Sequence, residues 1–261
     1  MKEYQSDIAI LTAVAIETES VRRLYPDWER VVLPHDHQEY YEAAFMKDGV
    51  RRRVITAQQN EMGMTAASML ASKIIHEFRP LYLIMTGIAA GIGADQIYGD
   101  VIVPDVIWNY SSGKFVSPHE AAINFGEVGF KLRPISLATD EGILQIVRER
   151  IGDPTNEFHL HIGPMACGSA VVANSEVVDK QIRSYLPETA GLDMESYGIA
   201  YAANFCSEPR PRAIVIKSIC DFANSEKSDD YQKFAAFTSS QFAKYLYENY
   251  LPLDDRNGNV E

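Results

Sequence analysis

The sequence is short of cysteine and has no long apolar run. Its three cysteines, at positions 167, 206 and 220, form no CxxC pair, which argues against a disulfide framework and against a zinc knuckle. No apolar run reaches the ~20 residues that a membrane-spanning helix needs. The opening residues MKEYQSD lack the basic flank and apolar centre of a signal peptide. We therefore expect buried thiols, a cytoplasmic protein and no membrane partner.

Basic residues are also scarce relative to acidic ones. Lys and Arg total 24 against 36 Asp and Glu, a formal net charge of −12, and such a surface repels the phosphates of nucleic acid. The 261 residues are 46% hydrophobic, which is enough for a packed core. No Pro-, Gly- or Ser-rich linker divides them. The sequence predicts one domain over residues 1–251, a polar tail over 252–261 and no nucleic-acid partner.

Short apolar runs rich in β-branched residues alternate with segments of helical periodicity, which is typical of α/β domains. The predicted strands cover 8–14, 54–57, 81–85, 101–103, 158–162 and 213–219, and the predicted helices cover 65–78, 141–151, 175–186, 195–205 and 230–250. Residues 40–57 are expected to form a β-hairpin around Asp48-Gly49. We expect a single-domain three-layer α/β/α fold with a central twisted mixed β-sheet flanked by helices.

Two segments break this regular pattern. Ile107–Pro134 has no sustained period and is predicted as a long functional or mobile loop. Thr86–Gly93 is glycine-rich, but only six residues separate it from the next strand, too few for the helical crossover of a dinucleotide-binding site. The expected structure is a turn whose small residues admit a ligand close to the backbone, or else pack backbone on backbone.

Three acidic residues follow apolar strands directly: Glu17, Glu195 and Asp221. If 189–194 and 213–219 are the parallel strands of one β-α-β unit, Glu195 and Asp221 face one crevice at the carboxyl edge, the default ligand site. Asp193 is then expected on the opposite strand face. Each acid also has a structural explanation, as a first-turn helix acid for Glu17 and Glu195 and as a cap for Asp221.

Five segments, in order along the chain, carry a family resemblance: Ala13–Glu17, Asn60–Ala67, Thr86–Gly91, Asp193–Glu195 and Ile219–Asn224. They resemble motifs of the purine nucleoside phosphorylase and methylthioadenosine/S-adenosylhomocysteine nucleosidase superfamily, and the nucleosidases most. The match runs over almost the whole chain. The resemblance implies a nucleoside phosphorylase-like fold and an N-glycosidase that hydrolyses a purine nucleoside or a derivative of one.

The resemblance also implies roles for the three acids. Asp221, protonated in an apolar crevice, would donate a proton to purine N7. Glu195, ionised, would accept hydrogen bonds from the ribose hydroxyls, with Met194 packed on the sugar. Glu17 would orient or deprotonate the attacking water. The further substrate-binding candidates are Val172 at the purine edge, Gly87 and Ile88 in the glycine-rich segment, Phe222 after the acid, and Met62 and Tyr231 on the sugar and 5′ side or in the core.

Three positions depart from the nucleosidase pattern. Cys220 stands where Ser is usual, Val171 where an aromatic ring commonly stacks on the base, and Ile88 where Ser or Thr is common. These changes put the chain in a divergent branch. Cys220 bears on the positioning of Asp221, and the three changes together bear on the identity of the substrate.

Other functions remain open at this point. A phosphorylase would need Arg and a hydroxyl where Met85 and Ile88 stand, a nucleotide-specific (AMP- or ATP-type) nucleosidase would share the same acids, and a non-enzymatic sensor could lose them. No metal or other cofactor is expected, because the histidines show no paired spacing; His159 and His161, which alternate on one strand face, are taken as structural. Ile107–Pro134 corresponds to the region that in the family reaches a neighbour's site, so a homodimer or higher homo-oligomer is expected.

Overall fold

A computed structural model describes residues 4–121, 123–125, 128–225 and 228–253, the side chains of 123–125 excepted. The helices are α1 Ala15–Arg22, α2 Met64–Phe78, η1 Pro118–Glu120, α3 Glu141–Arg148, α4 Ser175–Val177, the π-helix η2 Val178–Arg183, α5 Ser196–Phe205 and α6 Gln232–Asn249. The strands are β1 Ser6–Thr12, β2 Glu29–Val31, β3 Tyr40–Lys47, β4 Val50–Gln58, β5 Pro80–Gly91, β6 Val101–Val103, β7 Val106–Asn109, β8 Gly113–Val116, β9 Ile123–Phe125, β10 Val128–Leu132, β11 Ser136–Ala138, β12 Leu160–Ile162, β13 Met165–Cys167, β14 Gly191–Asp193 and β15 Arg212–Asp221.

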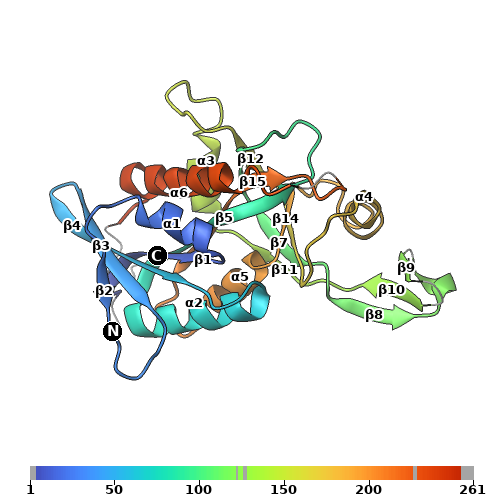
Figure 1. The fold of residues 1–261 in the computed structure, drawn as a ribbon, viewed down its shortest axis with the longest axis horizontal. Coiled ribbons are helices and arrows are strands. Elements are labelled where there is room, and N and C mark those ends of the chain that lie inside the picture. Colours follow the sequence, from blue (N-terminus) through green and yellow to red (C-terminus); the bar gives the residue numbers. More distant parts are fainter. Residues whose placement is uncertain (1–3, 122, 126–127, 226–227, 254–261) are drawn as a thin grey trace.

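A mixed sheet forms the centre of the molecule, in the order β11-β7-β13-β14-β5-β1-β4-β3-β2, with β15 joining β5 to β6 and β6 pairing β12. Helices α1, α3 and α6 cover one face and α2 and α5 the other (Figure 1). An apolar core lies under each helix layer, because strands buried on both faces present alternate side chains to either side. The predicted three-layer α/β/α fold with a mixed sheet is confirmed.

The predicted hairpin is confirmed as β3 and β4, which pair antiparallel around the turn at Asp48 and Gly49. The glycine-rich segment, however, is not a turn. Its residues Thr86–Gly91 are the last part of β5, which continues to Gly91 because β15 pairs with it as far as Ala90 and β14 pairs with Ala90 and Gly91. The predicted strand 81–85 therefore ended too early.

The parallel β-α-β unit predicted around Glu195 is wrong. β14 runs antiparallel to β5, whereas β15 runs parallel to β5, so β14 and β15 do not point the same way. Glu195 and Asp221 nevertheless lie at the same end of β5, because β14 and β15 both pair with its last residues. The hydrophobic runs correctly identified strands but carried no information on their direction.

Ile107–Pro134 is more ordered than the predicted loop. It contains β7 of the main sheet and a separate three-stranded antiparallel sheet, in the order β8-β10-β9, that projects away from the helix layers (Figure 1). The predicted helix 175–186 is short and irregular, made of α4 followed by the π-helix η2. Among the described residues no helix is both long and apolar enough to cross a bilayer.

The start of the predicted tail packs on the body of the domain. Leu253 is buried, its carbonyl accepts a hydrogen bond from Arg52, and the carbonyl of Pro252 accepts one from Tyr82. The rest of the predicted tail, residues 254–261, lies outside the described residues.

Candidate active site

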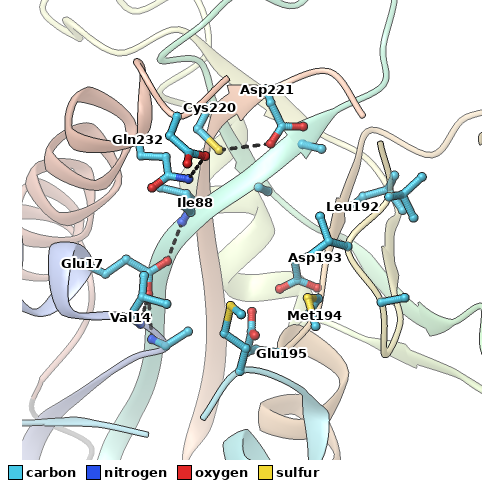
Figure 2. Close-up of a pocket in the computed structure, with 18 of the residues that line it drawn as sticks. Val14, Glu17, Ile88, Leu192, Asp193, Met194, Glu195, Cys220, Asp221 and Gln232 are labelled. Atoms are coloured by element: carbon cyan, nitrogen blue, oxygen red, sulfur yellow. Dashed lines mark hydrogen bonds between the residues drawn. The ribbon is translucent and has the colours of Figure 1, made fainter. Parts of the chain in front are cut away.

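A pocket of about 290 Å³ opens where the ends of β5, β14 and β15 meet the start of α1 (Figure 2). A concave, largely apolar site with a few convergent polar groups is typical of small-molecule binding. Its lining residues are Ala13, Val14, Glu17, Met62, Ile88, Ala89, Ala90, Tyr110, Ala170, Val171, Val172, Leu192, Asp193, Met194, Glu195, Cys220, Asp221, Asp229 and Gln232. All three acids singled out in the sequence line this one pocket.

Glu17 is held in place by three backbone donors. Its Oε2 accepts hydrogen bonds from the N–H groups of Ala13 at 2.7 Å and Val14 at 3.1 Å, and its Oε1 accepts one from Ile88 at 2.9 Å. The bond from Val14 caps the amino terminus of α1. Glu17 therefore also serves as a first-turn helix acid, the structural role considered for it from the sequence. The bond from Ile88 ties α1 to β5. A buried carboxylate with this many donors has a fixed position on the pocket wall.

Gly87 does not line the pocket but makes the position of Glu17 possible. A Cβ atom at Gly87 would lie 2.2 Å from Glu17 Oε1, far inside contact distance. The glycine is therefore required for close approach of a carboxylate to the strand backbone rather than for a turn. Ile88, the next residue, lines the pocket and supplies one of the three donors.

Glu195 belongs to a buried charge cluster. Its Oε1 accepts a hydrogen bond from the N–H of Gly63 at 2.9 Å, and its Oε2 lies 3.5 Å from the ammonium of Lys217. The same ammonium lies 3.3 Å from Asp193 Oδ2, and Lys217 is fully buried. Asp193 in turn accepts from the N–H and hydroxyl of Ser196 at the start of α5. One cation thus joins the two carboxylates beneath the pocket floor.

Burial and charge oppose each other in this cluster. Burial raises the pKa of Glu195, Lys217 lowers it, and Asp193 and Glu17 raise it again, with a net upward shift. Burial alone would lower the pKa of Lys217, but Asp193, Glu195 and Glu17 outweigh it and raise that pKa above the ordinary lysine value. Lys217 therefore stays protonated and supplies the positive charge that three nearby carboxylates require.

Asp221 lies at the end of β15, where a register shift between Ile219 and Asp221 turns the strand against β5. Its side chain is buried. Oδ1 accepts a hydrogen bond from the N–H of Ala223 at 2.9 Å, and Oδ2 is 3.5 Å from the thiol of Cys220. Figure 2 shows Asp221 across the pocket from Glu17 and Glu195. The three acids are thus separated rather than paired with one another.

Seven of the ten residues proposed from the sequence line the pocket: Glu17, Met62, Ile88, Val172, Met194, Glu195 and Asp221. Gly87, Phe222 and Tyr231 are not in its lining. Phe222 and Tyr231 instead contact Tyr98: the ring of Tyr231 stacks on it at 3.8 Å and that of Phe222 meets its edge at 4.9 Å. Phe222, which follows Asp221 directly in the chain, is thus held in an aromatic cluster rather than in the pocket lining.

The sequence reasoning missed several residues. Asp193 lines the same pocket as Glu195, so its predicted place on the far strand face is wrong. Lys217 had a usable signal, since a lysine inside the apolar run Ala213–Ile219 must pair with an acid if the strand is buried. Tyr110 also lines the pocket: burial raises its pKa to about 12, and its neutral hydroxyl donates to the carbonyl of Ala170 at 3.0 Å. It lay within the segment predicted as a loop.

Comparison with known proteins identifies the family of this chain. The profile described as the phosphorylase superfamily matches residues 7–248. The chain belongs to the phosphorylase superfamily. The three acids of the pocket lie within the matched region. The resemblance drawn from the five sequence motifs is therefore confirmed at the level of the superfamily.

The proteins to which this chain is similar carry different functional names. The chain is similar to the uncharacterized protein y4jS of Sinorhizobium fredii (34% identity, 85% of this chain and 56% of that protein). It is also similar to the ATP nucleosidase Cap17 of Escherichia coli (22%, 94% and 52%). It thus spans about half the length of these curated relatives. A solved 5′-methylthioadenosine/S-adenosylhomocysteine nucleosidase of Neisseria meningitidis, in complex with methylthio-immucillin-A, shares the fold (TM-score 0.73, 22% identity, 93% and 99% coverage).

Proposed function

We propose that this superfamily member hydrolyses the N-glycosidic bond of a purine nucleoside and releases the free base. The observation that carries the proposal is the placing of Glu17, Glu195 and Asp221 around one pocket, each held by separate backbone donors. Cleavage of this bond passes through an oxocarbenium-like state, so a site must neutralise the departing base, bind the sugar and activate a nucleophile. Three separated carboxyl groups suit these three tasks.

In the proposed reaction a water oxygen bonds to C1′ of the ribose as the C1′–N9 bond breaks. The electron pair of the broken bond goes to the purine, and Asp221 donates its proton to purine N7. Glu17 accepts the proton that the water loses. Glu195 accepts hydrogen bonds from the ribose hydroxyls, and Met194 beside it packs against the sugar. The products are the free base and the free sugar.

Water is favoured over phosphate as the nucleophile. A phosphate dianion must be desolvated to attack, and a site that binds it needs fixed cations or several donors. The described lining residues include five acids, namely Glu17, Asp193, Glu195, Asp221 and Asp229, and no Lys or Arg. Glu17 would repel a phosphate placed beside it, whereas a water molecule needs an acceptor of this kind.

The same acidity argues for a substrate without 5′ phosphates. Similarity to an ATP nucleosidase makes a nucleotide the second candidate, but a triphosphate would meet carboxylates and no cationic side chain among the described lining residues. We therefore expect a nucleoside with an uncharged 5′ group, such as a hydroxyl or a thioether. Val171, which is 57% exposed at the pocket, offers the base an aliphatic contact in place of an aromatic one.

Base release from a panel of substrates tests the proposal. Adenosine, methylthioadenosine, AMP and ATP are each incubated with the purified chain in phosphate-free buffer and again with millimolar phosphate, and free base and sugar products are measured. We expect equal rates in both buffers, free sugar as product, and turnover of the nucleosides above the nucleotides. A strict need for phosphate with a ribose 1-phosphate product would show a phosphorylase. A preference for ATP would refute the expected 5′ group but not hydrolysis.

A further inference from the structure

A second group of ligating side chains lies outside the pocket, on the paired strands β6 and β12. These strands are parallel, with Val101 opposite Leu160, so Asp100 and His159, which directly precede β6 and β12, also face each other. The N–H of Val101 donates to the carbonyl of His159 at 2.8 Å and fixes this register. Because side chains two apart on a strand share a face, His161 lies on the same side as His159.

The three side chains converge on the carboxylate of Asp100. Its Oδ1 lies 2.9 Å from His159 Nδ1, and its Oδ2 lies 2.7 Å from His161 Nε2. One ligand atom from each residue can be chosen so that all three lie within 4.8 Å of one another. The side chain of Asp100 is 2% exposed, that of His161 23% and that of His159 65%. The group thus runs from a buried carboxylate to an imidazole that solvent reaches.

The carboxylate is oriented by its surroundings before any ligand arrives. Asp100 Oδ2 also accepts a hydrogen bond from the N–H of Ile97 at 3.0 Å. The carbonyl of Asp100 accepts a hydrogen bond from the N–H of Ile219 at 2.9 Å. Supporting bonds of this kind hold metal ligands in place in metalloproteins.

We propose that Asp100, His159 and His161 bind a divalent transition-metal ion, with Zn²⁺ the best match. Two imidazole nitrogens and one carboxylate oxygen are ligands that Zn²⁺ accepts, with water in the fourth position. Mg²⁺ and Ca²⁺ prefer oxygen ligands throughout and fit the set poorly. The sequence reasoning assigned no metal because the histidines show no paired spacing; the third ligand, Asp100, is 61 residues from His161 in the chain.

The side chains must shift to accept the ion, because their ligand atoms now lie within 4.8 Å of one another rather than at tetrahedral spacing. Ligand bonds of about 2.1 Å around a tetrahedral Zn²⁺ put neighbouring N and O atoms about 3.4 Å apart. The present N–O distances of 2.7 and 2.9 Å, each to a different oxygen of Asp100, must therefore open by roughly half an ångström, and both imidazoles must turn toward one ion. Rotation of the exposed His159 ring provides much of this movement. The ion takes the place of the protons that the imidazoles share with the carboxylate, so binding weakens at low pH.

The site would stabilise the fold rather than take part in glycosidic chemistry. None of its three residues is in the lining of the pocket formed by the described residues. An ion there joins β12 to β6, and the hydrogen bond from Ile219 to Asp100 links β6 to the strand that ends at Asp221. We therefore expect the ion to raise the melting temperature of the chain and to have little effect on base release.

Metal titration of the full chain tests the proposal. The chain is purified without a histidine tag, treated with a chelator and dialysed, then titrated with ZnCl₂ by calorimetry and with CoCl₂ by visible absorption. We expect one ion per chain, a Co²⁺ ligand-field band and a higher melting temperature with Zn²⁺. Loss of a residue that only supports a metal ligand weakens metal binding by ~10–100-fold. H159Q and H161Q each remove a ligand itself, so each should weaken Zn²⁺ binding by at least that factor.

The matched control is H35Q. His35 Nε2 lies 3.1 Å and His76 Nε2 3.8 Å from Glu77 Oε1. H35Q therefore removes an imidazole from a histidine–carboxylate group whose ligand atoms, unlike those of Asp100, His159 and His161, do not all lie within 4.8 Å of one another. It should bind Zn²⁺ like the wild type. The proposal is overturned if the wild type shows no saturable binding and no Co²⁺ band, or if the H159Q/H161Q double variant retains both. If H161Q fails to fold, the more exposed H159Q and the wild-type Co²⁺ spectrum still decide the question.

Discussion

Replacing Lys217 with methionine removes the positive charge that pairs with both Asp193 and Glu195. At N–O distances of 3.3 and 3.5 Å, each pair has a Coulomb energy of about 5 kcal/mol at an effective dielectric constant of ~20, before the cost of burying both ions is subtracted. Methionine keeps much of the volume of the lysine stem, so lost packing contributes little. Removing one partner of a buried pair costs about 3–5 kcal/mol, and we expect K217M to lower the free energy of unfolding by that amount.

The same variant should change the dependence on pH. Lys217 lowers the pKa of Glu195 against the effect of burial, so the pKa of Glu195 rises further in K217M. Activity that requires an ionised Glu195 is then lost at a higher pH on the acid side. A carboxyl with a raised pKa binds more protons when folded than when unfolded, so its contribution to stability declines as the pH rises through the folded pKa. In K217M this decline extends to higher pH.

Chemical unfolding followed by circular dichroism, at several pH values, measures both effects. K217R keeps the charge and should lose less stability than K217M. The D193N/K217M double variant removes one anion with the cation, and should recover part of the stability that K217M loses. The reasoning is refuted if K217M unfolds within about 1 kcal/mol of the wild type, well below the expected loss, and if the acid limb of its activity profile does not move.

Three further predictions concern the proposed reaction and the assembly. D221N should lower kcat by ~10²–10⁴ with a much smaller change in KM, because the amide has no proton to give to the purine. Undiminished base release would remove Asp221 from the mechanism. The control is D230N, at an exposed site outside the pocket lining. G87A should also lower kcat, by roughly 10²-fold as for a misplaced catalytic group, because the new Cβ would stand 2.2 Å from Glu17 Oε1; wild-type kcat in a folded G87A would contradict this role of the glycine. Light scattering at assay concentration should give at least twice the chain mass of 29.2 kDa, since the small sheet β8-β10-β9 projects from the body as an arm; a fully active monomer would exclude that assembly.

The sequence by itself determined most of the strands and helices of the three layers and where the three acids fall along them, but not β7, which lies in the segment predicted as a loop, nor β11 and β13. Runs such as Ala213–Ile219 are apolar because the strands they form are buried on both faces, and this signal is local. The Asp48-Gly49 turn likewise fixed the β3–β4 hairpin from neighbouring residues alone. The positions of Glu17 and Asp221 beside strands could be read for the same reason.

Only the tertiary structure decided which strands pair and which side chains are neighbours. The antiparallel pairing of β14 with β5, the partners of Lys217, and the meeting of Asp100 with His159 and His161 each join residues far apart in the chain. Periodicity fixes which side of a strand a residue faces but leaves the strand's neighbours and direction open. Close approach of Glu17 to Gly87 has the same origin, since the space for a carboxylate exists only after α1 has packed against β5.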